Sequence, residues 1–146
     1  MVSPYVYQDQ ELTQAIIGVA IQVHKHLGPG LLETAYQWCL EIEFKDKGWI
    51  YQREQAVPLI YKNRKLDCGF RFDFLIENKI VLELKSVEQL LPVHEAQLLT
   101  YLRLLDKQVG LLINFNEPVL KKGIRRCVLG AKDHLSFSGQ GPVLAR

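Results

Sequence analysis

Apolar side chains recur every three or four residues in the first third of the chain, which is the period of an amphipathic helix. This spacing predicts one helix over residues 12–27 and a second over residues 31–48. Gly28-Pro29-Gly30 separates the two, because glycine and proline favour turns over continued helix, and Gly48 is a natural helix end. The chain is therefore expected to begin with two helices in succession.

Beyond the second helix the apolar period changes to two, which is typical of strands. Strands are predicted over residues 57–61, 66–76 and 80–85, with polar turns at Lys62-Asn63-Arg64 and Glu77-Asn78-Lys79. Tight turns join antiparallel strands. These three strands are therefore expected to form an antiparallel meander.

The last third of the chain returns to helical spacing and then to extended segments. A third helix is expected over residues 93–106, followed by a hydrophobic strand over residues 110–115. A strand, helix, strand order usually makes a right-handed parallel crossover. Residues 119–129 are expected to add an edge strand, and residues 136–142 a loop. No repeat or linker divides the chain, so the sequence predicts an α/β fold with a mixed sheet in one domain, residues 1–146.

Two acids and a lysine stand out in the predicted strands. Successive side chains on a strand point to opposite faces, so Glu83 and Lys85 share one face. A three-residue loop at residues 77–79 would place Asp73 directly opposite Glu83. Two carboxylates roughly 4.5–5.5 Å apart at Cβ destabilise a sheet unless a cation lies between them. The pattern therefore predicts a bound cation.

A simpler reading of the Glu-x-Lys pattern is a solvated strand face with cross-strand ion pairs. Asp73 argues against that reading, because it interrupts a phenylalanine-rich segment that is expected to be buried. A buried acid is costly unless it is paired or bound to a metal.

The overall charge of the chain does not indicate a nucleic-acid-binding protein. A length of 146 residues suits one domain with a substantial core, and the formal net charge is only +2. Any nucleic-acid surface must therefore be local. Lys121-Lys122 and Arg125-Arg126 form the best candidate patch in the sequence, although lysines on a solvated edge strand are also common.

The cysteines and the amino terminus give further expectations. Cys39, Cys68 and Cys127 are widely spaced and form no C-x-x-C pair, so neither a disulfide framework nor a zinc site is indicated. The first residues lack a basic segment followed by an apolar run, and no stretch has the length of a membrane span. A cytoplasmic protein that does not enter a membrane is expected.

The order of these elements resembles the core of the PD-(D/E)XK nuclease superfamily. That restriction-endonuclease-like core has the order αβββαβ, and here an extra helix would precede it. Asp73 lies on the second predicted strand and Glu83-Leu84-Lys85 on the third, as in the superfamily pattern. Phe72 stands where a proline usually precedes the first acid, which leaves the acid itself in place.

More narrowly, the chain resembles the GxxExxY family. The naming motif is matched by Gly30-Leu31-Leu32-Glu33-Thr34-Ala35-Tyr36. Residues 110–115 and 123–126 look like the later blocks of this family, and the match covers roughly residues 12–129. Each motif is weak alone, but their correct order makes the resemblance specific.

This resemblance implies a divalent metal held by Asp73 and Glu83, with the carbonyl of Leu84 as a further ligand. It also implies that Lys85 orients or activates water and stabilises charge. Carboxylates are hard oxygen ligands that suit Mg²⁺ or Mn²⁺, and such an ion both activates water and neutralises charge on a phosphate.

Two residues of the naming motif are candidate site residues. Glu33 lies near the start of the second predicted helix, where an acid also complements the helix dipole. The resemblance implies that Glu33 binds the metal or supports its ligands. Tyr36 lies on the same helix face by i,i+3 spacing. It is a candidate substrate or supporting contact, with a core aromatic as the commoner alternative.

Gln97 and Tyr101 form a Gln-x-x-x-Tyr pattern on one face of the third predicted helix. In RecB-like nucleases and lambda exonuclease, this motif lies beside the active site, so the resemblance implies contacts to substrate or to site residues. His94 shares that face, as a phosphate ligand or a solvated histidine.

Together these features predict a metal-dependent nuclease that hydrolyses phosphodiester bonds, with DNA as its nucleic-acid partner. The alternative from another class is a catalytically silent nuclease-fold module that binds nucleic acid or a protein partner. The weak net charge favours this alternative, or a homodimer or partner protein that supplies affinity for DNA.

Overall fold

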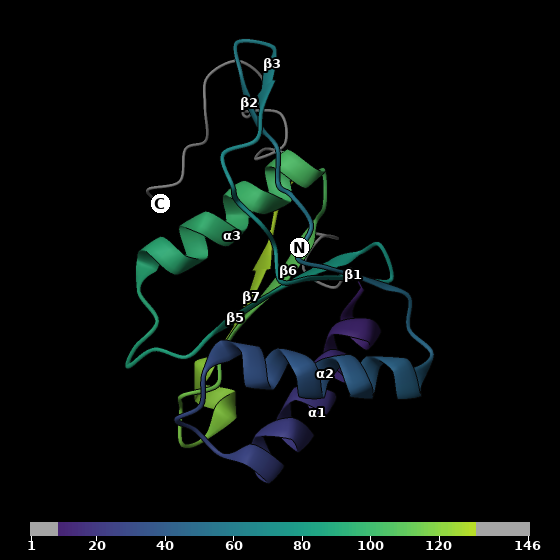
Figure 1. Ribbon diagram of the computed structural model, residues 1–146, viewed down its shortest axis with the longest axis vertical. Helices are drawn as coiled ribbons and strands as arrows, with labels where there is room; N and C mark the ends of the chain where they lie inside the picture. Colours follow the sequence, from purple (N-terminus) through teal and green to yellow (C-terminus); the bar gives the residue numbers. More distant parts are fainter. Residues whose placement is uncertain (1–8, 131–146) are drawn as a thin grey trace, which may run out of the picture.

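The computed structural model describes residues 9–130, in which helices cover both faces of a central sheet (Figure 1). The predicted loop at residues 136–142 lies outside these residues. The helices are α1 (Gln10–Leu27), α2 (Glu33–Lys47) and α3 (Pro92–Leu105), with a short 3₁₀ helix, η2 (Leu120–Gly123). The strands are β1 (Tyr51–Arg53), β2 (Leu59–Tyr61), β3 (Arg64–Leu66), β4 (Phe74–Ile76), β5 (Ile80–Lys85), β6 (Val109–Asn114) and β7 (Ile124–Val128).

The main sheet has five strands in the order β1-β4-β5-β6-β7. The first three are antiparallel, β6 runs parallel to β5, and β7 returns antiparallel at the edge. The chain between β5 and β6 passes through α3, which is the predicted crossover. The predicted α/β class with a mixed sheet is confirmed, as are the three helices and the edge strand.

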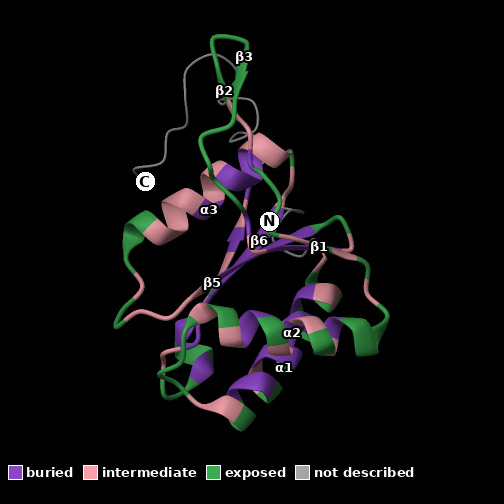
Figure 2. Cartoon of the chain, in the orientation of Figure 1, coloured by how far each residue is buried: buried purple, intermediate pink, exposed green. Residues whose placement is uncertain are grey.

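Each face of the sheet carries its own hydrophobic core. On one face, α1 and α2 pack against alternate residues of β4, β5 and β6, such as Phe74, Leu82 and Leu111. On the other face, α3 packs against the intervening residues, such as Val81 and Leu112. The strands between these layers are almost entirely buried (Figure 2). This two-sided burial explains why residues 80–82 of β5 and 109–113 of β6 are apolar without alternation.

The predicted meander of residues 57–61, 66–76 and 80–85 is right in its two antiparallel pairings, β2 with β3 and β4 with β5, but it does not form one sheet. Residues 57–61 do not join the main sheet, because β2 pairs only with β3 in a separate hairpin. The first strand of the sheet is β1, which pairs with β4 and was not predicted.

The predicted strand over residues 66–76 is interrupted between Leu66 and Phe74. Asp67 starts a turn in which its Oδ1 accepts a hydrogen bond from the N–H of Gly69, at 3.0 Å. Gly69 has a φ of +82°, which favours glycine. This Asx-type turn breaks the apparent alternation, and the sheet resumes only at β4.

The helix ends lie close to the predicted positions. Gly48 terminates α2 in the left-handed conformation, with a φ of 73°. At the start of α3, the N–H of Leu91 donates to Nδ1 of His94 at 2.9 Å. His94 therefore caps the helix. In the described part of the chain, no helix combines the length and apolarity needed to span a membrane.

Candidate active site

The β4–β5 hairpin has the register that the sequence predicts. Phe74 faces Leu82 and Ile76 faces Ile80, across a three-residue loop at residues 77–79. Glu77 and Asn78 are both left-handed, with φ values of 52° and 53°. Continuing this register by one residue places Asp73 opposite Glu83, as expected.

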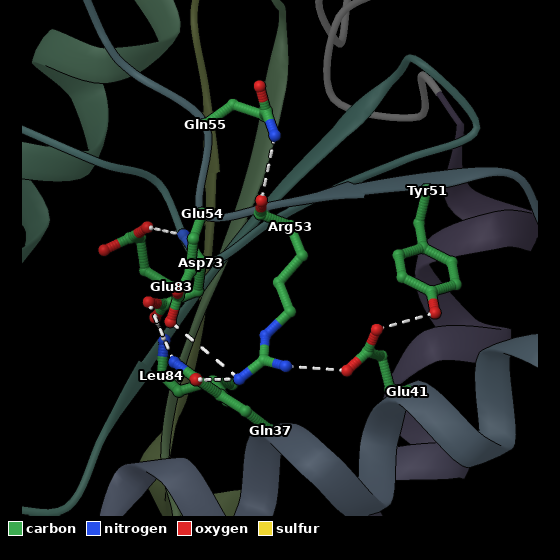
Figure 3. A network of polar contacts seen from close by, with 9 residues as sticks. All are labelled: Gln37, Glu41, Tyr51, Arg53, Glu54, Gln55, Asp73, Glu83 and Leu84. Atoms are coloured by element: carbon green, nitrogen blue, oxygen red, sulfur yellow. Dashed lines mark hydrogen bonds and ion pairs between the residues drawn. The ribbon is translucent and has the colours of Figure 1, made fainter.

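Each acid accepts a hydrogen bond from the backbone of the facing segment (Figure 3). The N–H of Asp73 donates to Oε1 of Glu83 at 2.8 Å. In return, the N–H of Leu84 donates to Oδ2 of Asp73 at 2.7 Å. These crossed bonds fix both carboxylates at the point where β4 begins, so neither is free to turn away from the other.

Burial makes this pair electrostatically costly when both acids are ionised. Glu83 is only 5% exposed. Burial, followed by the charge of Asp73, raises the pKa of Glu83 to about 8. Burial also raises the pKa of Asp73 to about 6, against the lowering effect of the Leu84 hydrogen bond. The pair therefore holds a proton near neutral pH, or accepts a cation in its place.

Lys85 and Glu33 lie within electrostatic reach of the two acids. The positive charge of Lys85, which is half-buried at the end of β5, lowers the pKa of both Asp73 and Glu83. The negative charge of Glu33, at the start of α2, raises the pKa of both. Both charges therefore act on the acid pair, while the roles of Lys85 and Glu33 at this site stay a prediction.

A residue that the sequence did not single out, Gln37, contacts Asp73 directly. Its Nε2 donates to Oδ1 of Asp73 at 3.1 Å. Arg53 Nη2 donates to Oε1 of Gln37 at 3.0 Å, and Arg53 Nη1 bonds Glu41 at 2.7 Å. Because Arg53 occupies the amide oxygen, Gln37 must present its NH₂ group to Asp73. Tyr51 completes the network through its hydroxyl, 2.9 Å from Glu41 (Figure 3).

The signal for Gln37 was present in the sequence but ambiguous. On α2, Tyr36 lies three residues after Glu33 and Gln37 lies four residues after it. Both residues therefore share the helix face of Glu33. The structure buries Tyr36 completely. Its hydroxyl donates to the carbonyl of Gly28 at 2.6 Å and accepts from the N–H of Leu31 at 3.2 Å. Tyr36 thus matches the core-aromatic alternative and holds the turn before α2.

The Gln-x-x-x-Tyr pattern lies on α3, which packs on the face of the sheet opposite to α1 and α2. Tyr101 is 5% exposed. Burial, followed by the charges of Glu83 and Asp73, raises the pKa of Tyr101 to about 12. Tyr101 therefore stays protonated close to the two acids. Gln97 lies one turn earlier and is half-buried, and among residues 9–130 its side chain makes no hydrogen bond.

The donor set at this site suits a hard cation. In a strand, the N–H and C=O of one residue point toward the same neighbour. The Leu84 carbonyl is therefore expected to face the same edge as its N–H, which bonds Asp73. Two carboxylates and one carbonyl are oxygen donors of the kind that Mg²⁺ and Mn²⁺ prefer. Over the described residues, no three His, Cys, Asp or Glu side chains gather into a metal-binding group, so Glu33 does not join the two acids as an adjacent third donor.

Comparison with known proteins identifies one family. The family model described as PD-(D/E)XK nuclease superfamily matches residues 10–127, which is most of the chain. The searches of curated proteins and of solved structures find no match.

Proposed function

Because this chain belongs to the PD-(D/E)XK nuclease superfamily, we propose that it is a metal-dependent nuclease that hydrolyses the phosphodiester bonds of DNA. The motif at residues 30–36 supports its placement in the GxxExxY family. The mutual fixing of Asp73 and Glu83 carries the proposal. A buried Glu83 and a half-buried Asp73 held face to face have no evident structural use, since their repulsion costs stability.

In this proposal, Asp73, Glu83 and the Leu84 carbonyl hold Mg²⁺ or Mn²⁺, and Glu33 is an auxiliary acid whose charge supports these ligands. When bound, such an ion supplies an activated water and neutralises charge on the scissile phosphate. Lys85 orients that water and stabilises the charge that develops on the phosphate oxygens. Its position on the same strand face as Glu83 supports this role.

The remaining candidate residues position these groups. Tyr101 and Gln97 contact the substrate or the acids from α3, which the closeness of Tyr101 to Glu83 supports. Tyr36 acts only through the Gly28–Leu31 turn. That turn also accepts a hydrogen bond from Ser86, whose Oγ lies 2.7 Å from the carbonyl of Leu31, next to the end of β5. Tyr36 thereby supports the start of α2, which carries Glu33.

The alternative, a catalytically silent nuclease-fold module, is favoured by one observation. Both oxygens of Asp73 already accept hydrogen bonds, from Leu84 and from Gln37. A metal would have to share or displace these donors. Calorimetric titration with Mn²⁺ separates the two proposals: a nuclease shows binding that weakens on Asp73→Ala, whereas a silent module shows none.

The proposed activity is tested on single-stranded, duplex, flap and branched DNA, with RNA counterparts, in Mg²⁺, Mn²⁺ or chelator. We expect cleavage of DNA that chelation abolishes and that Asp73→Ala removes. The matched control is Asp46→Ala, which deletes an exposed acid near the end of α2 and should leave cleavage unchanged. Cleavage that persists in chelator or in Asp73→Ala would contradict the proposed site.

A further inference from the structure

A hairpin arm, residues 55–72, projects from the sheet next to the candidate site (Figure 1). Its two sides are joined by backbone hydrogen bonds, from Phe72 N to Gln55 O and from Val57 N to Phe70 O. The arm ends in the β2–β3 hairpin, which lies beyond α3 and far from α1 and α2. Asp73 directly follows the arm, so the arm and the site share one edge of the molecule.

The arm is one of two local concentrations of positive charge in the chain, the other being the four basic residues within residues 121–126. The arm contains four basic residues and one acidic residue, a net charge of +3, whereas the whole chain has +2. The rest of the molecule is therefore slightly negative. A strand of nucleic acid is drawn to such a local patch even when the global field is weak.

The three basic residues at the tip are exposed and have no acidic partner among the described residues. Arg71 is paired with Asp67 at 3.2 Å, but Lys62, Arg64 and Lys65 form no ion pair in that part of the chain. Like charges would repel a second copy of the arm. This clustering therefore favours a negatively charged partner over self-association.

The arm also exposes large apolar side chains. Tyr61 is 61% exposed and Phe70 is 41% exposed, and the hairpin is almost wholly exposed (Figure 2). The Nζ of Lys62 lies 5.5 Å from the Tyr61 ring centroid. Basic groups next to exposed aromatic rings are the combination that binds single-stranded nucleic acid, because phosphates meet the charges and unpaired bases stack on the rings.

Phe70 connects the arm to the site. Its ring centroid lies 6.4 Å from that of Tyr101, and the phenol of Tyr101 is close enough to Asp73 and Glu83 to respond to their charges. About seven residues separate Phe70 from Asn63 in the turn at the tip, a length of roughly 20 Å at strand spacing. Phe70 thus lies between the tip of the arm and the acids.

We propose that the hairpin arm binds a single strand of nucleic acid and leads it to the candidate site. Lys62, Arg64 and Lys65 contact phosphates, and Tyr61 and Phe70 stack on bases. The delivery of the strand for cleavage rests on the proposed function. The binding itself does not, and it is measurable without metal or catalysis.

The first test is binding of the full chain to a fluorescent oligonucleotide of about 20 nucleotides, longer than the roughly 4–16 covered by one binding fold. Anisotropy is measured in chelator over a range of salt. The triple variant Lys62→Gln, Arg64→Gln, Lys65→Gln should bind single-stranded DNA at least tenfold more weakly. The slope of log K against log salt should become less negative by about 2, since each lost phosphate contact contributes about 0.7 to this slope.

The matched control removes the same charge from the opposite side of the molecule, as Lys25→Gln, Lys45→Gln, Lys47→Gln on α1 and α2 (Figure 1). It should bind nearly as the parent does. A rival variant, Lys121→Gln, Lys122→Gln, Arg125→Gln, removes the basic patch near β7. If the control or the rival loses as much affinity as the arm variant, the inference is overturned. A larger loss on duplex than on single-stranded DNA also overturns it.

The second test concerns stacking. Tyr61→Leu and Phe70→Leu keep an apolar side chain but remove the aromatic face, so each should weaken single-strand binding about tenfold. Ile60→Ala, which removes an equally exposed apolar group without a ring, is the control and should have little effect. Unchanged binding by both leucine variants would contradict base stacking.

The two proposals fail in different ways. If the arm variants lose binding while the parent cleaves no substrate, the arm inference stands and the proposed nuclease function fails. If the parent cleaves DNA and the arm variants bind and cleave as the parent does, the arm inference alone fails. When both hold, the arm variants raise KM and leave kcat unchanged, whereas Asp73→Ala removes kcat.

Discussion

The two acids are positioned by backbone groups of the facing strand. Asp73 bonds the N–H of Leu84, and Glu83 bonds the N–H of Asp73. Such bonds hold a charged group in place without neutralising it, so the cost of two buried charges remains. Lys85 offsets part of this cost, and a bound cation would offset more.

Lys85→Ala should abolish cleavage while leaving the fold intact. The substitution removes the positive charge that stabilises the reacting phosphate, and loss of one such group typically lowers kcat by about 10²–10³-fold. Initial rates in Mn²⁺ and thermal melting measure the two effects. Lys79→Ala, an exposed lysine of the same hairpin, is the control. Full activity in Lys85→Ala would exclude this lysine from the reaction.

Gln37→Glu should shift the pH dependence of cleavage upward. The new carboxylate would face Asp73, whose pKa is already raised, and a second negative charge raises it further. Asp73 would then ionise only at higher pH. Gln37→Met, which removes the hydrogen bond without adding charge, should shift the profile less. The acid limb of kcat/KM against pH is the measurement, and Gln22→Glu, exposed on α1, is the charge-matched control.

At the level of elements, α3 packs on β6 at Gly110, where Leu98 occupies the space that a side chain would fill. A Cβ at Gly110 would lie 2.9 Å from Cδ1 of Leu98. Leu98 is one residue after Gln97 and three before Tyr101, so the depth at which α3 packs sets the distance of that helix face from the acids. Small residues at such contacts let backbones approach, and added volume in a packed core has a cost.

Gly110→Ala should destabilise the fold by about 1–3 kcal/mol, because Leu98 must move or α3 must shift. Gly18→Ala is the control for a glycine replacement, since Gly18 is exposed on α1 and a Cβ there would meet nothing within 4 Å. That variant should gain about 0.4–1 kcal/mol through helix propensity and unfolded-state entropy. Chemical denaturation measures both changes. Equal stability of the two variants would show that α3 is not packed tightly on Gly110.

For the whole molecule, the buried acids couple stability to pH and to metal. In the unfolded chain, Asp73 and Glu83 should titrate at about 4, whereas their folded pKa values are about 6 and about 8. The folded state therefore binds more protons between these limits. By linkage, stability falls as pH rises through this window.

Divalent ions should reverse this loss. They bind the ionised carboxylates of the folded state, so the rise in Tm with Mn²⁺ should be small near pH 5 and larger near pH 8. Asp73→Asn should stabilise the metal-free protein at pH 8 by relieving repulsion, and it should reduce the response to Mn²⁺. Asp46→Asn should do neither. A metal-free protein whose Tm rises steadily from about pH 5 to about pH 8 would contradict the buried pair.

Local period and turn length were enough to predict several elements of this fold from the amino-acid sequence. The three helices, β5, β6 and the edge strand β7 followed from apolar spacing, because each of these elements buries a regular set of side chains. The register of Asp73 against Glu83 followed from the three-residue loop and the two-residue period of the strands. These are short-range constraints, and the chain satisfies them without reference to the rest of the fold.

Long-range packing, in contrast, selects the strand that completes the sheet and the side chains that reach the acids. β1 is three residues long and contains Gln52 and Arg53, so its pattern was too short and too polar to predict. It pairs with β4 across the inserted arm, a contact between residues distant in sequence. That pairing brings Arg53 to Gln37 and fixes the amide that contacts Asp73. Helix period alone could not choose between Tyr36 and Gln37, because the choice depends on where α2 packs against the sheet.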